Sequence, residues 1–170
     1  MKKTLIAVIL FAATISCYSM DERMIREWKA STWRLNILLK SDTVHGCAVQ
    51  FAIIESEPRH IFNRNYSMFL EKMKKHKIHG NTDSAVNLMI AWDTLFRNVK
   101  GDEVYLLLKN EQSGFSSNGP EKEYYLVTRA SMIMDQPAAW IIRFHAKKGT
   151  RQDIILDDRN AVFLKDVVEN

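Results

Sequence analysis

The clearest pattern along the chain is an alternation of apolar and polar residues over positions 32–40. The odd positions there are apolar, and the even positions are polar except for Leu38. A period of two places successive side chains on opposite faces of a β-strand, so one face is buried and the other is wet. Residues 47–55 alternate in a similar way after a turn-forming segment. We therefore expect a β-hairpin in which Cys47 and Phe51 share the inward face.

Apolar residues at helical spacing predict four helices, over about residues 20–29, 66–78, 83–98 and 160–168. The segment 83–98 is apolar around most of its circumference and has only a narrow polar strip. A helix of this kind is buried on more than one side. We expect it to be the central helix of the domain and to lie across a sheet.

The second half of the chain predicts four more strands, over about residues 103–109, 124–134, 140–145 and 154–156. Pro137 is expected to end the second of these strands. Residues 110–121 are rich in Gly, Pro, Ser and Asn, which predicts a long exposed loop that carries Phe115. The Phe115 ring is either an exposed contact for a partner or an anchor that tucks into the domain.

The predicted order is helix, two strands, two helices, four strands and helix. Hairpins dominate this order and no βαβ crossover is indicated, so the expected class is α+β with an antiparallel sheet. We expect about six strands, arranged as an N-terminal hairpin plus a C-terminal meander, packed on a central buried helix. Residues 20–170 would form this single domain.

Residues 1–19 have the pattern of a secretory signal peptide. Lys2 and Lys3 precede the segment 4–15, which is apolar apart from two threonines and too short to cross a bilayer comfortably. The alternative is a buried N-terminal helix or strand. The pattern favours export to the periplasm or the medium, or attachment to the envelope by a lipid.

Cys17 has three possible fates. Cleavage between positions 16 and 17 would leave Cys17 as the lipid-bearing first residue of a lipoprotein. Ordinary signal peptidase would instead cut after Ser19, between positions 19 and 20, and remove the cysteine. If Cys17 is retained, it can pair with Cys47, the other cysteine of the chain.

The charge balance argues against nucleic acid as a partner. The chain has 24 basic and 20 acidic side chains, a net charge of +4. Removal of Lys2 and Lys3 with the signal leaves 22 minus 20, or +2. A domain this close to neutrality lacks the electrostatic attraction that nucleic-acid binding requires.

The strongest local charge bias lies over residues 72–79, with lysines at Lys72, Lys74, Lys75 and Lys77. This tract is either a contact patch for an anionic partner or a solvated helix end, where cations favour the negative end of the helix dipole. His76 and His79 are spaced as two ligands on one helix face. Zinc needs three or four ligands and the lysines would repel it, so we expect no metal and no cofactor.

Catalytic signatures are weak. Cys47 lies two residues from His45, but the flanking residues match no cysteine-protease pattern. Asp157 and Asp158 could act as paired carboxylates, although Asp before a short helix is more often a cap. Neither a Gly-x-Ser-x-Gly motif nor a phosphate-binding glycine loop is present in the sequence.

The sequence therefore favours an exported bacterial envelope protein that binds another envelope protein without catalysis, as an inhibitor, an immunity-type protein or an accessory factor of secretion or assembly. The expected contact residues are Phe115 and the lysines Lys72, Lys74, Lys75 and Lys77. Membrane contact would occur only through a lipid on Cys17. The alternatives are a carrier of a small apolar ligand and a hydrolase-type enzyme.

Overall fold

The computed structural model describes residues 22–44, 48–75, 84–99 and 104–169. Within these ranges the helices are α2 (Glu22–Ser31), α3 (Pro58–Lys75), α4 (Ser84–Val99) and α5 (Leu164–Glu169). The strands are β1 (Trp33–Leu39), β2 (Ala48–Ile54), β3 (Tyr105–Leu108), β4 (Gln112–Ser117), β5 (Glu123–Thr128), β6 (Ser131–Ile133), β7 (Gln136–His145), β8 (Arg151–Leu156) and β9 (Ala161–Phe163).

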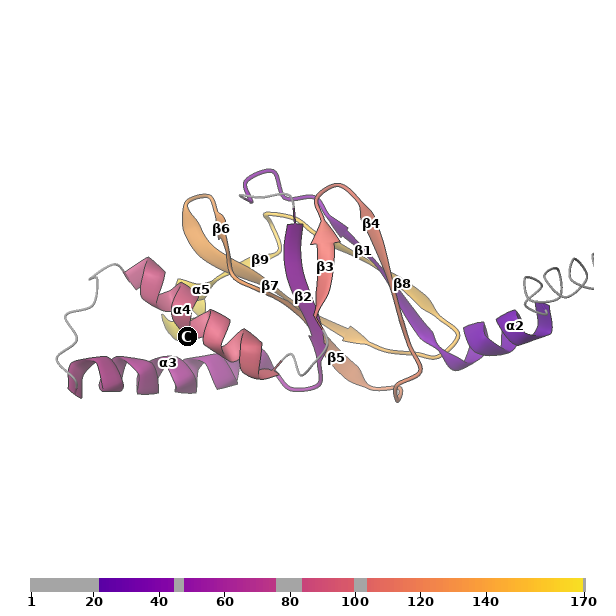
Figure 1. The fold of residues 1–170 in the computed structure, drawn as a ribbon, viewed down its shortest axis with the longest axis horizontal. Helices are drawn as coiled ribbons and strands as arrows, with labels where there is room; N and C mark the ends of the chain where they lie inside the picture. Colours follow the sequence, from indigo (N-terminus) through magenta and orange to yellow (C-terminus); the bar gives the residue numbers. More distant parts are fainter. Residues whose placement is uncertain (1–21, 45–47, 76–83, 100–103, 170) are drawn as a thin grey trace, which may run out of the picture.

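The strands form two sheets, and the α+β class is confirmed (Figure 1). One sheet has three strands in the order β4-β1-β8. The other has the order β3-β2-β5-β7-β6, with β9 also paired to β7. Neighbouring strands are antiparallel, except that β1 and β8 are parallel and an isolated parallel bridge joins Leu39 to Lys109.

The predicted N-terminal hairpin is wrong. Strand β1 pairs with β4 and β8, whereas β2 pairs with β3 and β5 in the other sheet. The alternation did identify the inward side chains, because Leu35 and Ile37 of β1 and Val49 and Phe51 of β2 are all buried in one cluster. The two strands thus contribute to the same core from two sheets, not as neighbours in one sheet.

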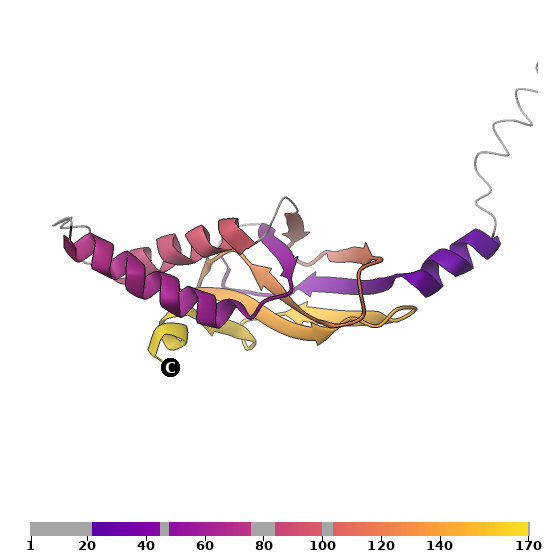
Figure 2. The same ribbon diagram turned by 90° about the horizontal axis from the view of Figure 1, so that it is seen from below.

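Both faces of the six-stranded sheet take part in core packing. One face shares a core with the three-stranded sheet, and the other packs against α3, α4 and α5. Successive residues of β5 point to opposite faces of the sheet. Leu126 belongs to the core between the two sheets, and Val127 belongs to the core under the helices. Figures 1 and 2 show α3, α4 and α5 gathered at one end of the molecule, while α2 projects from the other end.

Helix α4 is the expected packed helix, in contact with α3, α5 and β7. Trp92 and Leu95 are fully buried on its inner face. Its apolar circumference is not buried throughout, however, because Val86 is 39% exposed and Ile90 is 48% exposed.

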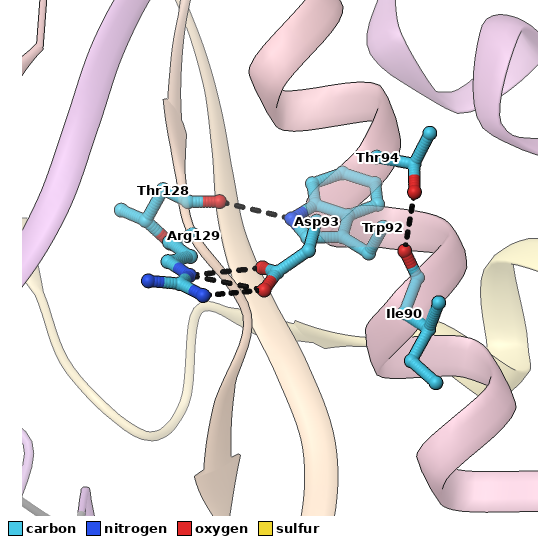
Figure 3. A network of polar contacts seen from close by, with 6 residues as sticks. All are labelled: Ile90, Trp92, Asp93, Thr94, Thr128 and Arg129. Carbon is cyan, nitrogen blue, oxygen red and sulfur yellow. Dashed lines mark hydrogen bonds and ion pairs between the residues drawn. The ribbon is translucent and has the colours of Figure 1, made fainter.

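Figure 3 shows how α4 is tied to the end of β5. The Trp92 indole Nε1 donates a hydrogen bond of 3.0 Å to the carbonyl oxygen of Thr128. The neighbouring Asp93 carboxylate accepts from both Nε and Nη2 of Arg129, at 3.1 and 2.7 Å. These polar contacts therefore hold the helix in register on the sheet.

Two local predictions are wrong, and a third is right only in part. The segment 110–121, predicted as a loop, contains strand β4. Pro137 lies inside β7, after a turn in which Met134 and Asp135 have φ angles of 49° and 60°. The last predicted helix begins as strand β9 and becomes helical only at Leu164.

Several predictions fall outside the described residues. The signal peptide with Cys17, the pair His45 and Cys47, and Lys77 are in this group. Lys72, Lys74 and Lys75 lie in the last turn of α3, but their side chains are not described. Among the described residues, no helix is long and apolar enough to cross a membrane.

Candidate functional site

Helix α2 carries an apolar face that the described part of the chain leaves uncovered. Met24, Ile25 and Trp28 lie on the same side of this ten-residue helix. Met24 is 60% exposed and Trp28 is 46% exposed. A helix this short is marginal in water by its own propensity, and it gains most of its stability when its apolar face packs on something.

Hydrogen bonds nevertheless close the base of α2 and link the residue that follows it to the turn before β8. The Trp28 carbonyl oxygen accepts hydrogen bonds from the Ser31 hydroxyl and from both the hydroxyl and the backbone N–H of Thr32, at 3.0 to 3.1 Å. Gly149 then donates its N–H to the carbonyl of Thr32 at 2.8 Å, from a turn in which its φ is 73°. The Trp28 backbone is therefore held in place relative to β1.

Two surface pockets flank β4, and both are bordered by Trp28, Phe115 and Ser116. The outer pocket has a volume of about 210 Å³ and is lined by Trp28, Arg34, Leu35, Asn36, Gly114, Phe115, Ser116 and Arg151. The edge pocket has a volume of about 390 Å³ and is lined by Trp28, Ser31, Thr32, Tyr105, Phe115, Ser116, Ser117 and Asn118. We call the surface formed by these two pockets the Trp28 surface.

Strand β4 is an edge strand at this surface. It is paired with β1 on one side, and no second pairing partner is found among the described residues. After the turn at Asn110, the ribbons of β3 and β4 diverge (Figure 1), while the rings of Tyr105 and Phe115 meet between them. The strand has the sequence QSGFSS, which lacks the Lys, Pro or inward charge that usually protects an edge.

Phe115 lies in strand β4, and its ring packs against the domain, which is the second of the two alternatives that the sequence left open. Its ring is half-buried and packs 5.4 Å from the ring of Trp33 and 4.9 Å from that of Tyr105, measured between centroids. Phe115 therefore belongs to the rim of the core between the sheets. Its role in partner binding stays a prediction, but the more exposed aromatic ring at this surface is Trp28.

Sequence reasoning missed Trp28 as a candidate contact. Its spacing from Met24 and Ile25 predicts a short helix with one apolar face, and such a face usually packs inward. The sequence feature that could have pointed to Trp28 is the position of its helix in the chain. This short helix directly precedes the first strand. The sequence pattern does not indicate which other segment would pack against its apolar face.

The outer pocket carries uncompensated positive charge. Arg34 of β1 lies directly opposite Arg151 of β8, and its Nε atom is buried without a hydrogen-bond partner. Arg151 lies 3.9 Å from Asp153, which also accepts a hydrogen bond from the Asn36 amide. The Asp153 carboxylate thus lies beside the guanidinium group of Arg151, and the neighbouring Arg34 adds a second positive charge.

A third pocket is bordered by α3, β9 and α5. It has a volume of about 390 Å³ and is lined by Arg59, His60, Asn63, Val162, Asp166 and Val167. The Asn63 Oδ1 atom is buried without a partner there. Arg59 and His60 are exposed, and the described residues contain no cluster of three or more His, Cys, Asp or Glu that could hold a metal ion.

Asp157 and Asp158, for which the sequence left paired carboxylates and the more common capping role as alternatives, hold turns together. Asp157 accepts hydrogen bonds from the backbone N–H groups of Arg159 and Asn160. Asp158 accepts one from the fully buried hydroxyl of Ser41. Burial alone would raise the pKa of Asp158, but hydrogen bonds from Ser41 and from the backbone of the following loop residues hold that pKa below its ordinary value.

This arrangement predicts a specific acid sensitivity. Because the pKa of Asp158 is lower in the folded protein, its contribution to stability is full above about pH 4 and is lost as the pH falls further. Asp158→Asn should therefore weaken the dependence of the unfolding free energy on pH below about 4. Urea unfolding between about pH 2 and 6 measures this. Asp135→Asn, on an exposed turn, is the matched control, and equal curves for Asp158→Asn and wild type would contradict the prediction.

Comparison with known proteins assigns no family. No protein-family model and no curated protein matches the chain. A solved structure that matches is that of the full-length major pilin RrgB from Streptococcus pneumoniae, at 8% sequence identity over 74% of this chain. The chain spans only 30% of the pilin, and with a TM-score of 0.25 the similarity carries no conclusion about fold or function.

Proposed function

We propose that this chain is an exported, non-catalytic module that binds another protein of the bacterial envelope through the Trp28 surface. The observation that carries the proposal is the exposed ring of Trp28, which stands at the border of two pockets beside an unprotected edge strand. Tryptophan is among the residues most enriched at the energetic centres of protein interfaces. An edge strand is also a ready template for pairing with a segment of another chain.

The rigid base of α2 supports the same function. Ordering a contact residue on binding costs conformational entropy, and a residue whose backbone is already fixed avoids part of that cost. The three hydrogen bonds to the Trp28 carbonyl fix that backbone before any partner arrives.

Export rests on the N-terminal sequence. The two lysines and the apolar segment that follow Met1 favour delivery to the periplasm or the medium, with a lipid on Cys17 as the membrane-anchored alternative. The lysines at the last turn of α3 provide a second candidate contact, at the end of the molecule away from α2 (Figures 1 and 2).

Site-specific photo-crosslinking in the native host tests the proposal. A photoreactive phenylalanine analogue at Ser116 should give one recurrent adduct with an envelope protein, because Ser116 borders both pockets. Trp28→Ala in the same chain should reduce the adduct at least about tenfold, as expected for loss of a central aromatic contact. Excess unlabelled wild-type protein should compete for the adduct, and excess Trp28→Ala protein should not.

The control places the same analogue at Arg159, an exposed turn residue at the far end of β8. An adduct at Ser116 no stronger than at Arg159, or one that Trp28→Ala leaves unchanged, would show that this surface does not bind a partner.

A further inference from the structure

The further inference concerns the chemistry of the partner segment, and it starts from Arg34. The Nε of this residue is buried without a partner, although a guanidinium carries donors that are normally satisfied. Directly opposite on the parallel strand is Arg151, which is 56% exposed. Like charges placed opposite each other on neighbouring strands destabilise a sheet, so a second anion beside this pair would be favourable.

The space above β4 is open toward this pair. Across from Arg34 on the other side of β1 lies Ser116, and across from Asn36 lies Gly114. A Cβ atom added at Gly114 would have nothing within 4 Å. These small residues therefore leave a passage from the free edge of β4 to the guanidinium of Arg34, with Trp28 bordering the same pocket.

The reach also fits. A strand added to the edge of β4 would lie two strand spacings from β1, roughly 10 Å. Glutamate and arginine side chains that extend toward each other over Ser116 can span that separation. A carboxylate matches the fork of donors on a guanidinium, which binds it through two parallel hydrogen bonds.

We propose that the partner adds to β4 as a β-strand and places an acidic side chain over Gly114 and Ser116, where its carboxylate pairs with Arg34 and Arg151. The inference rests on the proposed function and deepens it by naming the partner's chemistry. Side chains alternate along a strand, so the partner's next residue would face the edge pocket beside Tyr105, Phe115 and Ser117. A small apolar residue suits that position, which is bordered by two half-buried rings.

The test uses two short blocked peptides, Thr-Val-Glu-Val-Thr and its neutral counterpart Thr-Val-Gln-Val-Thr, with the isotope-labelled mature protein. The Glu peptide should shift the NMR signals of the β4 backbone amides and of the Arg34 Nε–H. Its dissociation constant at low salt should be at least about tenfold lower than that of the Gln peptide, as expected for a charge-assisted hydrogen bond at a half-buried site. Added salt should reduce the difference.

Variants locate the effect. Arg34→Gln should abolish the difference between the two peptides, and Arg151→Gln, at an exposed position, should reduce it. Arg159→Gln makes the same change of charge at the far end of β8 and should leave the difference unchanged.

Equal affinity of the two peptides would overturn the inference, and so would a response confined to residues outside β4 and Arg34. Titration with inorganic phosphate tests whether the pocket binds free oxyanions instead of a peptide strand. If phosphate shifts Arg34 and blocks the Glu peptide while the β4 amides never respond, the pocket binds free oxyanions and the strand proposal fails. A persistent crosslink at Ser116 without any carboxylate preference would leave the proposed function standing and reject this inference alone.

Discussion

Trp92→Ala is expected to lower the free energy of unfolding by about 3–5 kcal/mol, the usual cost of removing a large buried ring. Trp92 is fully buried, and its ring meets that of Phe62 edge-on with centroids 5.0 Å apart. The substitution would also leave the Thr128 carbonyl without its indole donor (Figure 3). Because this residue joins α4 to both α3 and the sheet, its loss affects the whole helical layer.

Chemical unfolding in urea measures the effect. Trp92→Phe keeps most of the ring and loses the hydrogen bond, so it should cost about 1–3 kcal/mol. Thr94→Ala is the control on the same helix, since its exposed hydroxyl bonds only the Ile90 carbonyl one turn back, and it should change stability by less than about 0.5 kcal/mol. A loss below about 1 kcal/mol for Trp92→Ala would mean that α4 is not held on the sheet as described.

Phe115→Ala is expected to cost about 2–3 kcal/mol, less than a fully buried ring because Phe115 is only half-buried. Its contacts with Trp33 and Tyr105 join the rims of the two sheets. Trp28→Ala, in contrast, should cost less than about 1 kcal/mol, because the ring is 46% exposed and its carbonyl contacts do not depend on the side chain.

Paired measurements of stability and crosslinking separate the two aromatic residues. Trp28→Ala should weaken partner binding in a protein of nearly normal stability, whereas Phe115→Ala should lower the melting temperature. If the two variants show the reverse behaviour, Phe115 is the binding residue that the sequence first indicated, and Trp28 packs within the fold.

Much of the secondary structure could be predicted because it depends on local periodicity. The alternation at 32–40 identified β1 and its inward side chains, and helical spacing at 83–98 identified α4 nearly residue for residue. The α+β class followed from the order of these elements. Local periodicity indicates which side of a helix or strand is buried. The pattern is the same whichever other element packs against that side.

Strand pairing was not decided by those patterns. Inward residues of β1 and β2 would look identical in a hairpin and in two facing sheets, because both arrangements bury the same side chains. The parallel pairing of β1 with β8 joins residues more than a hundred positions apart, which no local pattern records. Strand β4 was predicted as a loop because its serines and glycine have low strand propensity, and only its pairing with β1 makes it a strand.

The candidate site divides in the same way. The sequence alone determined that the chain has an N-terminal helix with a tryptophan, a central apolar helix and strands of alternating polarity. Only the tertiary structure decided that Trp28 stays exposed, that Phe115 turns into the rim of the core, and that Arg34 stands opposite Arg151 without a partner for its Nε. Exposure and pairing depend on which distant segments arrive beside a residue, and that outcome is set by the packing of both sheets together.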